Sequence, residues 1–383
     1  YLLTLTISFI TGFLFCYLGR NSRKDINLTD QIIFILLSFF LLPLLISIPY
    51  YFSIYNITFL NSYFESVSGF TTTGFSIMKT LMTLISSFIV ESKFTMDRRF
   101  DFLLATIGTI GSKQIKIKPA YLLSGGASGR NFYNNYNYNI IKISLIYFFS
   151  TIFVIFLYSL FEIRLFDAFN LAFTTISSGG FIPTDNLSNI TENNIQIFVL
   201  SITLLFPILN LFFLHDIITR KFTLRNYQED IHLLTLIISL TLIIYFFVIP
   251  DTGFANVIFA ITSSISSSGI TTYKSNIDLS LFFILLTIVG GSLISTSSGF
   301  KYTRIYILLK ISYQEIHRFV KPINIIDKNL YNSDAKIDDQ DVKIAFLVFI
   351  SFIISIFILS SILTLDILTF ENSFKLSILT LTN

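Results

Sequence analysis

Long runs of apolar residues recur along this chain, and they decide what it can fold into. A helix needs about 20 mostly apolar residues to cross a bilayer. Runs that meet or approach this length are Leu2–Leu18, Ile32–Ile54, Ile140–Phe161, Ile195–Leu214, Ile231–Ile249, Leu279–Leu309 (interrupted) and Ile344–Leu365, with a weaker stretch from Leu81 to Ile110. Charged residues make up only 13% of the 383 residues, against about 25% in a soluble domain. We therefore expect an all-α integral membrane protein.

Three shorter segments between these runs have a different composition. Each begins with an apolar helical pattern and ends in hydroxyl residues and glycine, as in Phe64–Phe75, Phe166–Phe181 and Phe254–Ile270. Each is too short to cross a bilayer, and each follows one long apolar run and precedes another. The sequence thus predicts an internal repeat of span, half-helix, glycine turn and span.

The glycine turns suggest an ion pathway. Irregular backbone at membrane depth is tolerated only where it is buried in protein or lines water. Glycine can take a positive φ that directs successive carbonyl groups to one side, and rings of carbonyls can replace the hydration shell of K⁺. The half-helix before each turn would add its partial negative end. One such turn alone is better explained as an interfacial loop, but three in the same frame favour the pathway.

The remaining composition argues against other classes of function. The net charge of +3 is small and scattered, which gives no reason to expect nucleic acid as a partner. The single cysteine has no partner for a disulfide, and the three histidines lack metal-ligand spacing. No nucleophile elbow, phosphate loop or paired-carboxylate motif occurs, so we do not expect an enzyme; a multi-pass membrane enzyme is the weakest alternative.

The turn motifs resemble the filter segments of the Trk/Ktr/HKT superfamily of potassium-uptake proteins. They read Thr72-Thr73-Gly74-Phe75, Ser178-Gly179-Gly180-Phe181 and Ser267-Ser268-Gly269-Ile270. Further motifs are similar to the TrkH branch and follow in the same order: Asn210–His215 with the acidic pair Glu229-Asp230, the glycine-rich Gly290–Lys301, and Phe370–Phe374.

This resemblance implies a fold of four unequal repeats of span, re-entrant pore helix and span around a central ion pore. The expected boundaries are 1–30 for an N-terminal span and cytoplasmic loop, 31–130, 131–230 and 231–340 for the first three repeats, and 341–383 for the start of the fourth. The implied activity is K⁺ uptake by a channel-like transporter, with K⁺ as the substrate and no cofactor.

The resemblance also assigns roles to residues. A selectivity filter of backbone carbonyls, which would be the only metal site, is expected at Thr72, Thr73, Gly74, Ser178, Gly179, Gly180, Ser267, Ser268 and Gly269. The break in the third repeat implies an intramembrane gating loop with Gly290, Gly291, Ser295, Thr296, Gly299, Lys301 and Arg304. For Lys301 and Arg304 an alternative stays open, because cations at the cytoplasmic end of a span also serve as topology signals.

Location and partners follow from the same resemblance. It implies a multi-pass protein of the cell inner membrane, surrounded by lipid, that forms a homodimer and binds a cytosolic nucleotide-binding regulatory subunit of the TrkA type. The distribution of Lys and Arg puts the glycine turns at the outer face. The basic segments Lys113–Arg130 and Lys310–Lys336 are candidate docking surfaces, or act only as topology signals.

Two features depart from the family pattern. The expected inner span of the first repeat carries six charges between Glu91 and Asp101, which at mid-bilayer would cost more than about 10 kcal/mol. The chain begins at Tyr1 and ends at Asn383, just short of a fourth filter glycine, so we expect it to be incomplete at both ends. Both features leave open the alternative of a non-conducting fragment or pseudogene product of such a transporter.

Overall fold

The structure, a computed structural model, describes residues 2–20, 28–52, 57–77, 136–184, 186–218, 224, 227–250, 252–271, 279–320, 329–331, 337–365 and 368–382. Within these residues the chain is helical and contains no β-strand. The weak span predicted at Leu81–Ile110, with its charged segment, and the basic segment Lys113–Arg130 lie outside the described residues.

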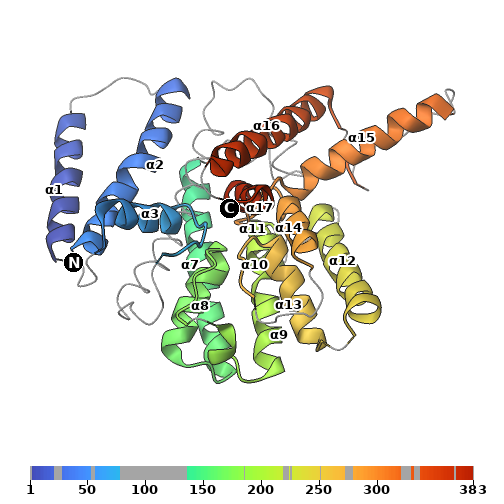
Figure 1. Cartoon of the computed structure of the whole chain (residues 1–383), viewed down its shortest axis with the longest axis horizontal. Coiled ribbons are helices and arrows are strands. Elements are labelled where there is room, and N and C mark those ends of the chain that lie inside the picture. The colour runs from blue at the N-terminus through green and yellow to red at the C-terminus, as the bar shows by residue number, and fades with distance from the viewer. Residues whose placement is uncertain are drawn as a thin grey trace.

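Four long helices are each followed by a short helix that packs back against them. The pairs are α2 (Leu28–Tyr51) with α3 (Phe59–Phe70), α7 (Tyr136–Leu160) with α8 (Leu165–Ser177), α12 (Gln228–Ile243) with α13 (Phe254–Ile265), and α16 (Asp339–Thr364) with α17 (Phe370–Leu381). Helix α12 continues into a π-helical segment, η4 (Ile244–Val248), and α1 (Leu2–Gly19) packs beside α2. In Figure 1, α1 and α2 stand at one edge of the molecule and α15 (Tyr302–Val320) projects from the other.

Two of the predicted spans are interrupted. The run Ile195–Leu214, predicted as one span, forms α9 (Asn194–Thr203), α10 (Leu205–Ile208) and α11 (Leu211–Ile218), preceded by a short 3₁₀ turn, η2 (Leu187–Asn189). The predicted break in Leu279–Leu309 is confirmed, because α14 (Ser280–Val289) and α15 are separated by loop 290–301.

The two interrupted segments are hydrogen-bonded to each other. The carbonyl oxygens of Pro207 and Ile208 accept hydrogen bonds of 2.8 Å from the backbone N–H groups of Ser297 and Ser292 in loop 290–301. At Leu209 the chain turns to an extended conformation, with ψ of 163°. Backbone groups that leave their own helix are therefore satisfied by the other broken segment, as a dry environment demands.

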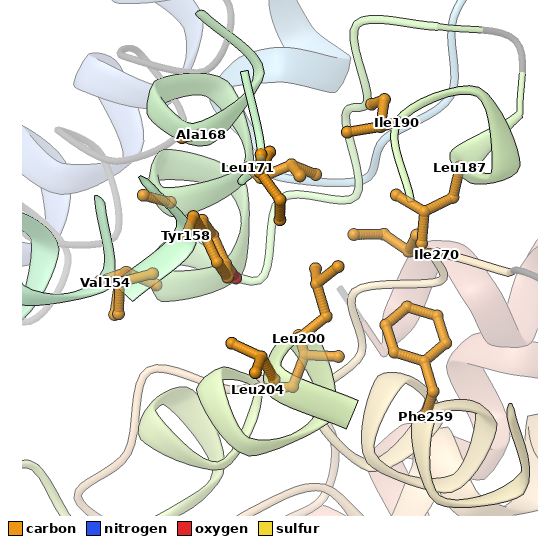
Figure 2. Close-up of a cluster of buried hydrophobic side chains, with 14 of the residues drawn as sticks. Val154, Tyr158, Ala168, Leu171, Leu187, Ile190, Leu200, Leu204, Phe259 and Ile270 are labelled. Atoms are coloured by element: carbon orange, nitrogen blue, oxygen red, sulfur yellow. The ribbon is translucent and has the colours of Figure 1, made fainter. Parts of the chain in front are cut away.

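A hydrophobic core joins the second and third helix pairs. Tyr158 of α7, Leu171 of α8, Leu200 of α9 and Phe259 of α13 are all fully buried in this cluster (Figure 2). The Tyr158 hydroxyl lies 2.5 Å from Thr203 Oγ1, so the polar end of this buried ring is satisfied. Helices α8 and α13 both contribute side chains to this core, and both lead into glycine turns.

The outer surface is apolar over much of its area. Two helical segments, Gln228–Val248 and Asp339–Thr364, are long and apolar enough to cross a membrane by length and composition. Only 22% and 11% of the residues in their most apolar windows are buried inside the protein. Apolar helices with outward-facing side chains need an apolar solvent, which a bilayer supplies.

Replacing Phe259 by alanine tests this core. The ring is fully buried, so the substitution leaves a cavity, and we expect a loss of about 3 kcal/mol in the free energy of unfolding. The measurement is the melting temperature of the purified full-length protein in detergent. The matched control is Phe247→Ala, because this ring is 84% exposed and its loss should change stability by less than about 0.5 kcal/mol. Equal losses for the two variants would contradict the packing described above.

Candidate functional site

The ends of α3, α8 and α13 are built in the same way. At the end of α3, the Thr72 N–H donates to the Gly69 carbonyl at 3.2 Å, and the Thr73 N–H donates to the Ser68 carbonyl at 3.0 Å. This pair of bonds defines a Schellman motif, which satisfies carbonyls that the helix end would leave unpaired. The same bonds recur at the other ends: Ser178 to Thr175 at 3.3 Å, Gly179 to Thr174 at 2.9 Å, Ser267 to Ser264 at 3.0 Å and Ser268 to Ser263 at 3.1 Å.

Each of the three turns also uses two residues with positive φ. Thr72, Ser178 and Ser267 have φ of 55°, 53° and 61°, where a Schellman motif usually has glycine. This conformation costs a residue with a side chain about 1–2 kcal/mol. Two positions later, Gly74, Gly180 and Gly269 have φ of 77°, 75° and 66°. The prediction that the three glycines adopt positive φ is confirmed.

The three turns lie side by side. A Cβ atom placed on Gly74 would lie 3.0 Å from the carbonyl oxygen of Gly179, and one placed on Gly180 would overlap the carbonyl oxygen of Ser268. The first turn therefore faces the second, and the second faces the third, with backbone oxygens between them. Residues about 90 to 105 positions apart in the sequence meet at each of these two contacts.

The turns themselves carry no charged side chain, and several of their residues are buried. Thr72, Ser178, Ser267 and Ser268 are all buried. The Ser178 and Ser267 hydroxyl oxygens have no hydrogen-bond partner within the described part of the chain. The partial negative ends of three helices meet at this point. Such a site offers oxygen atoms, without a fixed counter-charge, to a cation.

Side chains of the half-helices hold the chain just beyond each glycine. Ser68 Oγ donates to the Phe75 carbonyl at 2.5 Å, and Ser263 Oγ donates to the Ile270 carbonyl at 2.6 Å, both seven residues ahead. At the equivalent position of α8, Thr174 Oγ1 is buried without a partner among the described residues. The first and third turns are thus braced by a serine, and the second turn is not.

The first turn has an additional brace in a buried carboxylate. Glu65 of α3 accepts a hydrogen bond of 2.5 Å from Ser76 Oγ and one of 3.0 Å from the Ile77 N–H. The side chain is buried, so its two polar partners are needed to offset desolvation. Glu65 therefore holds the chain as it leaves the first turn.

Loop 290–301 folds tightly upon itself. Its ends are joined by bonds from the Phe300 N–H to the Ile288 carbonyl at 2.8 Å and from the Tyr302 N–H to the Gly291 carbonyl at 3.0 Å. Gly299, with φ of 85°, is so close to α14 that a Cβ atom would lie 2.7 Å from the Thr287 carbonyl oxygen. Only glycine fits at this crossing.

The side chain of Lys301 forms hydrogen bonds within its own loop. Its Nζ atom donates to the Ser297 carbonyl at 2.6 Å and to both the carbonyl and the hydroxyl oxygen of Ser295 at 3.1 Å. Lys301 itself has a positive φ of 78°. Arg304, one turn further on, reaches the Phe300 carbonyl at 3.4 Å. The lysine charge thus lies among the backbone oxygens of the loop.

The acidic pair at the start of α12 holds both broken segments. Glu229 Oε1 accepts the Leu293 N–H at 3.0 Å, and Asp230 Oδ1 accepts the Asn210 N–H at 2.7 Å. The loop also touches the second turn, because Thr296 Oγ1 donates to the Ile176 carbonyl at 3.1 Å, two residues before Ser178. One hydrogen-bonded assembly therefore connects α12, loop 290–301 and the end of α8.

Known proteins are similar to this chain in sequence and in fold. No protein-family model matches the chain. It is 25% identical over 360 residues to the uncharacterized cation transporter MJ1485 of Methanocaldococcus jannaschii, covering 91% of this chain and 73% of the relative. It is 26% identical to the Trk system potassium uptake protein TrkG of Escherichia coli and 24% identical to TrkH of Salmonella typhimurium, covering 86% of this chain and 71% of each relative.

The fold agrees with these relatives. The crystal structure of the potassium transporter TrkH from Vibrio parahaemolyticus superimposes with a TM-score of 0.81 at 18% identity, over 99% of this chain and 82% of that one. In sequence and in fold, the chain is therefore similar to Trk-type potassium transporters. It is a membrane-embedded protein and not an enzyme.

The structure places the sequence-predicted residues of this Trk-type chain in two groups. The nine predicted filter residues form the three adjoining turns, and six of the seven predicted gate residues lie in loop 290–301, with Arg304 in the first turn of α15. The bracing residues Glu65, Ser68 and Ser263 were not predicted. A glutamate inside an apolar half-helix was a visible signal for Glu65, whereas the two serines look like many others in this chain.

The close approach of the second and third turns can be tested with Gly180→Ala. The added Cβ would overlap the Ser268 carbonyl oxygen and must also tolerate a φ of 75°, so we expect a loss of about 2 kcal/mol or more in stability. The matched control is Gly69→Ala, because Gly69 is helical and no atom lies within 4 Å of its Cβ position. Melting temperatures in detergent report both effects. A Gly180→Ala protein as stable as the control would contradict the adjacency of the turns.

The hold of Glu229 on loop 290–301 can be tested with Glu229→Ala. A hydrogen bond to a charged group contributes about 1.5–3 kcal/mol, so deuterium exchange at Leu293 should rise by roughly tenfold or more. The control is Glu371→Ala, since Glu371 pairs with Lys375 at the surface of α17, and this change should leave exchange at Leu293 unaltered. Unchanged exchange at Leu293 in Glu229→Ala would show that the loop is held by its other contacts.

Proposed function

We propose that this chain carries K⁺ across the cell inner membrane as a multi-pass, channel-like transporter. The observation that supports this most directly is the juxtaposition of the first, second and third turns through Gly74, Gly179, Gly180 and Ser268. Relatives that share the sequence over most of its length are named potassium uptake proteins.

The nine turn residues act as a selectivity filter through their backbone carbonyls. Carbonyl oxygens of adjoining turns replace the water molecules that a K⁺ ion loses on entry. The helix ends add attraction without binding the ion tightly, because they carry partial rather than full charges. An uncharged filter lets the ion leave again, which transport requires.

Loop 290–301 acts as the gate. It lies against the end of α8 through Thr296 and holds a lysine charge at its own centre. In this position the Lys301 ammonium repels a cation that leaves the filter. The carbonyl bonds inside the loop support this role over that of a cytoplasmic topology signal. Transport then requires the loop to shift, with Gly290, Gly291 and Gly299 as the points where its backbone can bend.

The assembly state follows the same proposal. The transporter is a homodimer in the lipid bilayer, and a cytosolic nucleotide-binding subunit of the TrkA type moves the gate. The described part of the basic segment Lys310–Lys336 includes the second half of the projecting helix α15 (Figure 1), whose first residue follows directly after loop 290–301. A partner that binds α15 therefore has a short mechanical path to loop 290–301.

The alternative is a non-conducting protein that keeps the fold. The charged segment Glu91–Asp101 in the expected inner span of the first repeat favours it, because charges inside a bilayer are costly. Transport by the full-length gene product decides between the two functions.

The decisive experiment is Rb⁺ and Na⁺ uptake by the full-length protein in cells that lack K⁺ uptake. Gly269→Ala is the sharpest variant, because no other described residue has an atom within 4 Å of its Cβ position, apart from its chain neighbours, while φ is 66°. The left-handed φ costs the new side chain about 1–2 kcal/mol, so protein levels and melting temperature are checked first, and we expect a loss of Rb⁺ over Na⁺ preference of about tenfold, equal to about 1.4 kcal/mol. Gly69→Ala is the control. Unaltered preference in Gly269→Ala would defeat the filter assignment, and no uptake by the unmodified protein would favour the non-conducting alternative.

A further inference from the structure

A cavity of about 220 Å³ lies behind loop 290–301. Its walls come from α7, α9, α10, the first residue of α11 and the end of α8, and they include Tyr147, Ser150, Ile176, Ile202, Phe206 and Thr296. It adjoins the hydrogen bond by which Thr296 joins the loop to the Ile176 carbonyl beside the second turn. A molecule in this cavity therefore lies against Thr296 of the loop.

The lining offers little to water. The hydroxyl groups of Ser150 and Thr296 already donate to backbone carbonyls, Ser150 Oγ to Tyr147 at 2.9 Å and Thr296 Oγ1 to Ile176 at 3.1 Å. Most of the other lining side chains are isoleucine, leucine or phenylalanine. An apolar cavity of about 150 Å³ stays dry in water and takes up a small hydrocarbon. This larger one is suited to the same kind of occupant.

The cavity wall continues onto the apolar outer surface. Ile202 in the wall is 42% exposed. The Phe206 ring lies 6.3 Å, centroid to centroid, from the ring of Phe153, which is itself exposed on α7. Phe149, one turn earlier on α7, is also exposed. In a membrane-embedded protein this surface faces hydrocarbon, so lipid chains are the apolar molecules at the cavity wall.

We propose that this cavity binds an acyl chain of a membrane phospholipid and that the bound chain holds loop 290–301 against α8. The acyl chain fills the cavity. In an empty cavity the lining side chains would lack van der Waals contacts on one side. The acyl chain also keeps water away from the bond between Thr296 and Ile176. The binding is independent of the transport role, whereas its effect on the gate rests on the function proposed above.

The absence of tryptophan from the sequence makes the binding directly measurable. Phe206→Trp puts the only tryptophan of these 383 residues in the cavity wall, and any tryptophan elsewhere in the full-length protein is first replaced by phenylalanine. In vesicles of phosphatidylcholine with brominated acyl chains, we expect its emission to be quenched. Phe149→Trp, on the exposed face of α7, gives the quenching expected for direct lipid contact. Phe259→Trp, in the core, gives the quenching expected without lipid contact.

A second substitution separates a chain in the cavity from lipid at the surface. Ser150→Leu fills the cavity, so quenching of the 206 reporter should be lost while quenching of the 149 reporter stays unchanged. Ser150→Ala leaves the space open and should keep the quenching. If Ser150→Leu lowers the melting temperature, Ile202→Phe, on the opposite wall, replaces it. Quenching at 206 that persists after the cavity is filled, or that never occurs, would overturn the proposal.

Rb⁺ uptake by Ser150→Leu then tests the effect on the gate. We expect a changed rate with an unchanged Rb⁺ over Na⁺ preference, since the filter turns are untouched. Lost quenching together with an unaltered uptake rate would overturn the control of the gate and leave the binding established. Because quenching needs no ion flux, failure of the transport function cannot be mistaken for failure of the binding.

Discussion

Everything in this structure depends on one constraint: backbone that leaves helical geometry inside an apolar molecule must still satisfy its N–H and C=O groups. Three helix ends meet it by closing in Schellman motifs, whose bonds recur at the same spacing in each. The closure forces Thr72, Ser178 and Ser267 into a left-handed conformation that glycine would adopt at no cost. Strain of this kind persists where the surroundings over-determine the backbone, and it is typical of functional sites.

The same constraint joins the two broken inner segments. The carbonyls of Pro207 and Ile208 and the N–H groups of Ser292 and Ser297 have no helical partners, and they satisfy each other. Glu229 and Asp230 then take up two further N–H groups. Because each break completes the other, a shift of either segment would break hydrogen bonds to the other.

The contact of Thr296 with Ile176 joins the loop to the second turn, and the cavity lies beside this contact. The second turn also lacks the serine brace of the other two, because Thr174 Oγ1 donates no bond to the chain ahead. The turn that touches the loop is thus the one held least firmly by its own half-helix. A change at the loop or in the cavity therefore has a direct route to this turn.

The sequence by itself determined the helical class, the order of long and short helices, the positive φ of Gly74, Gly180 and Gly269, and the break after α14. These features depend on local properties: apolar run length, hydroxyl and glycine composition, and the conformational freedom of glycine. Only the tertiary structure decided that Gly180 meets Ser268, that Ile195–Leu214 breaks at Leu209, and that Glu65 and Glu229 hold backbone N–H groups. Those outcomes depend on which backbone N–H and C=O groups, distant in the sequence, remain without a helical partner. The composition of an apolar run does not show which of these groups will meet.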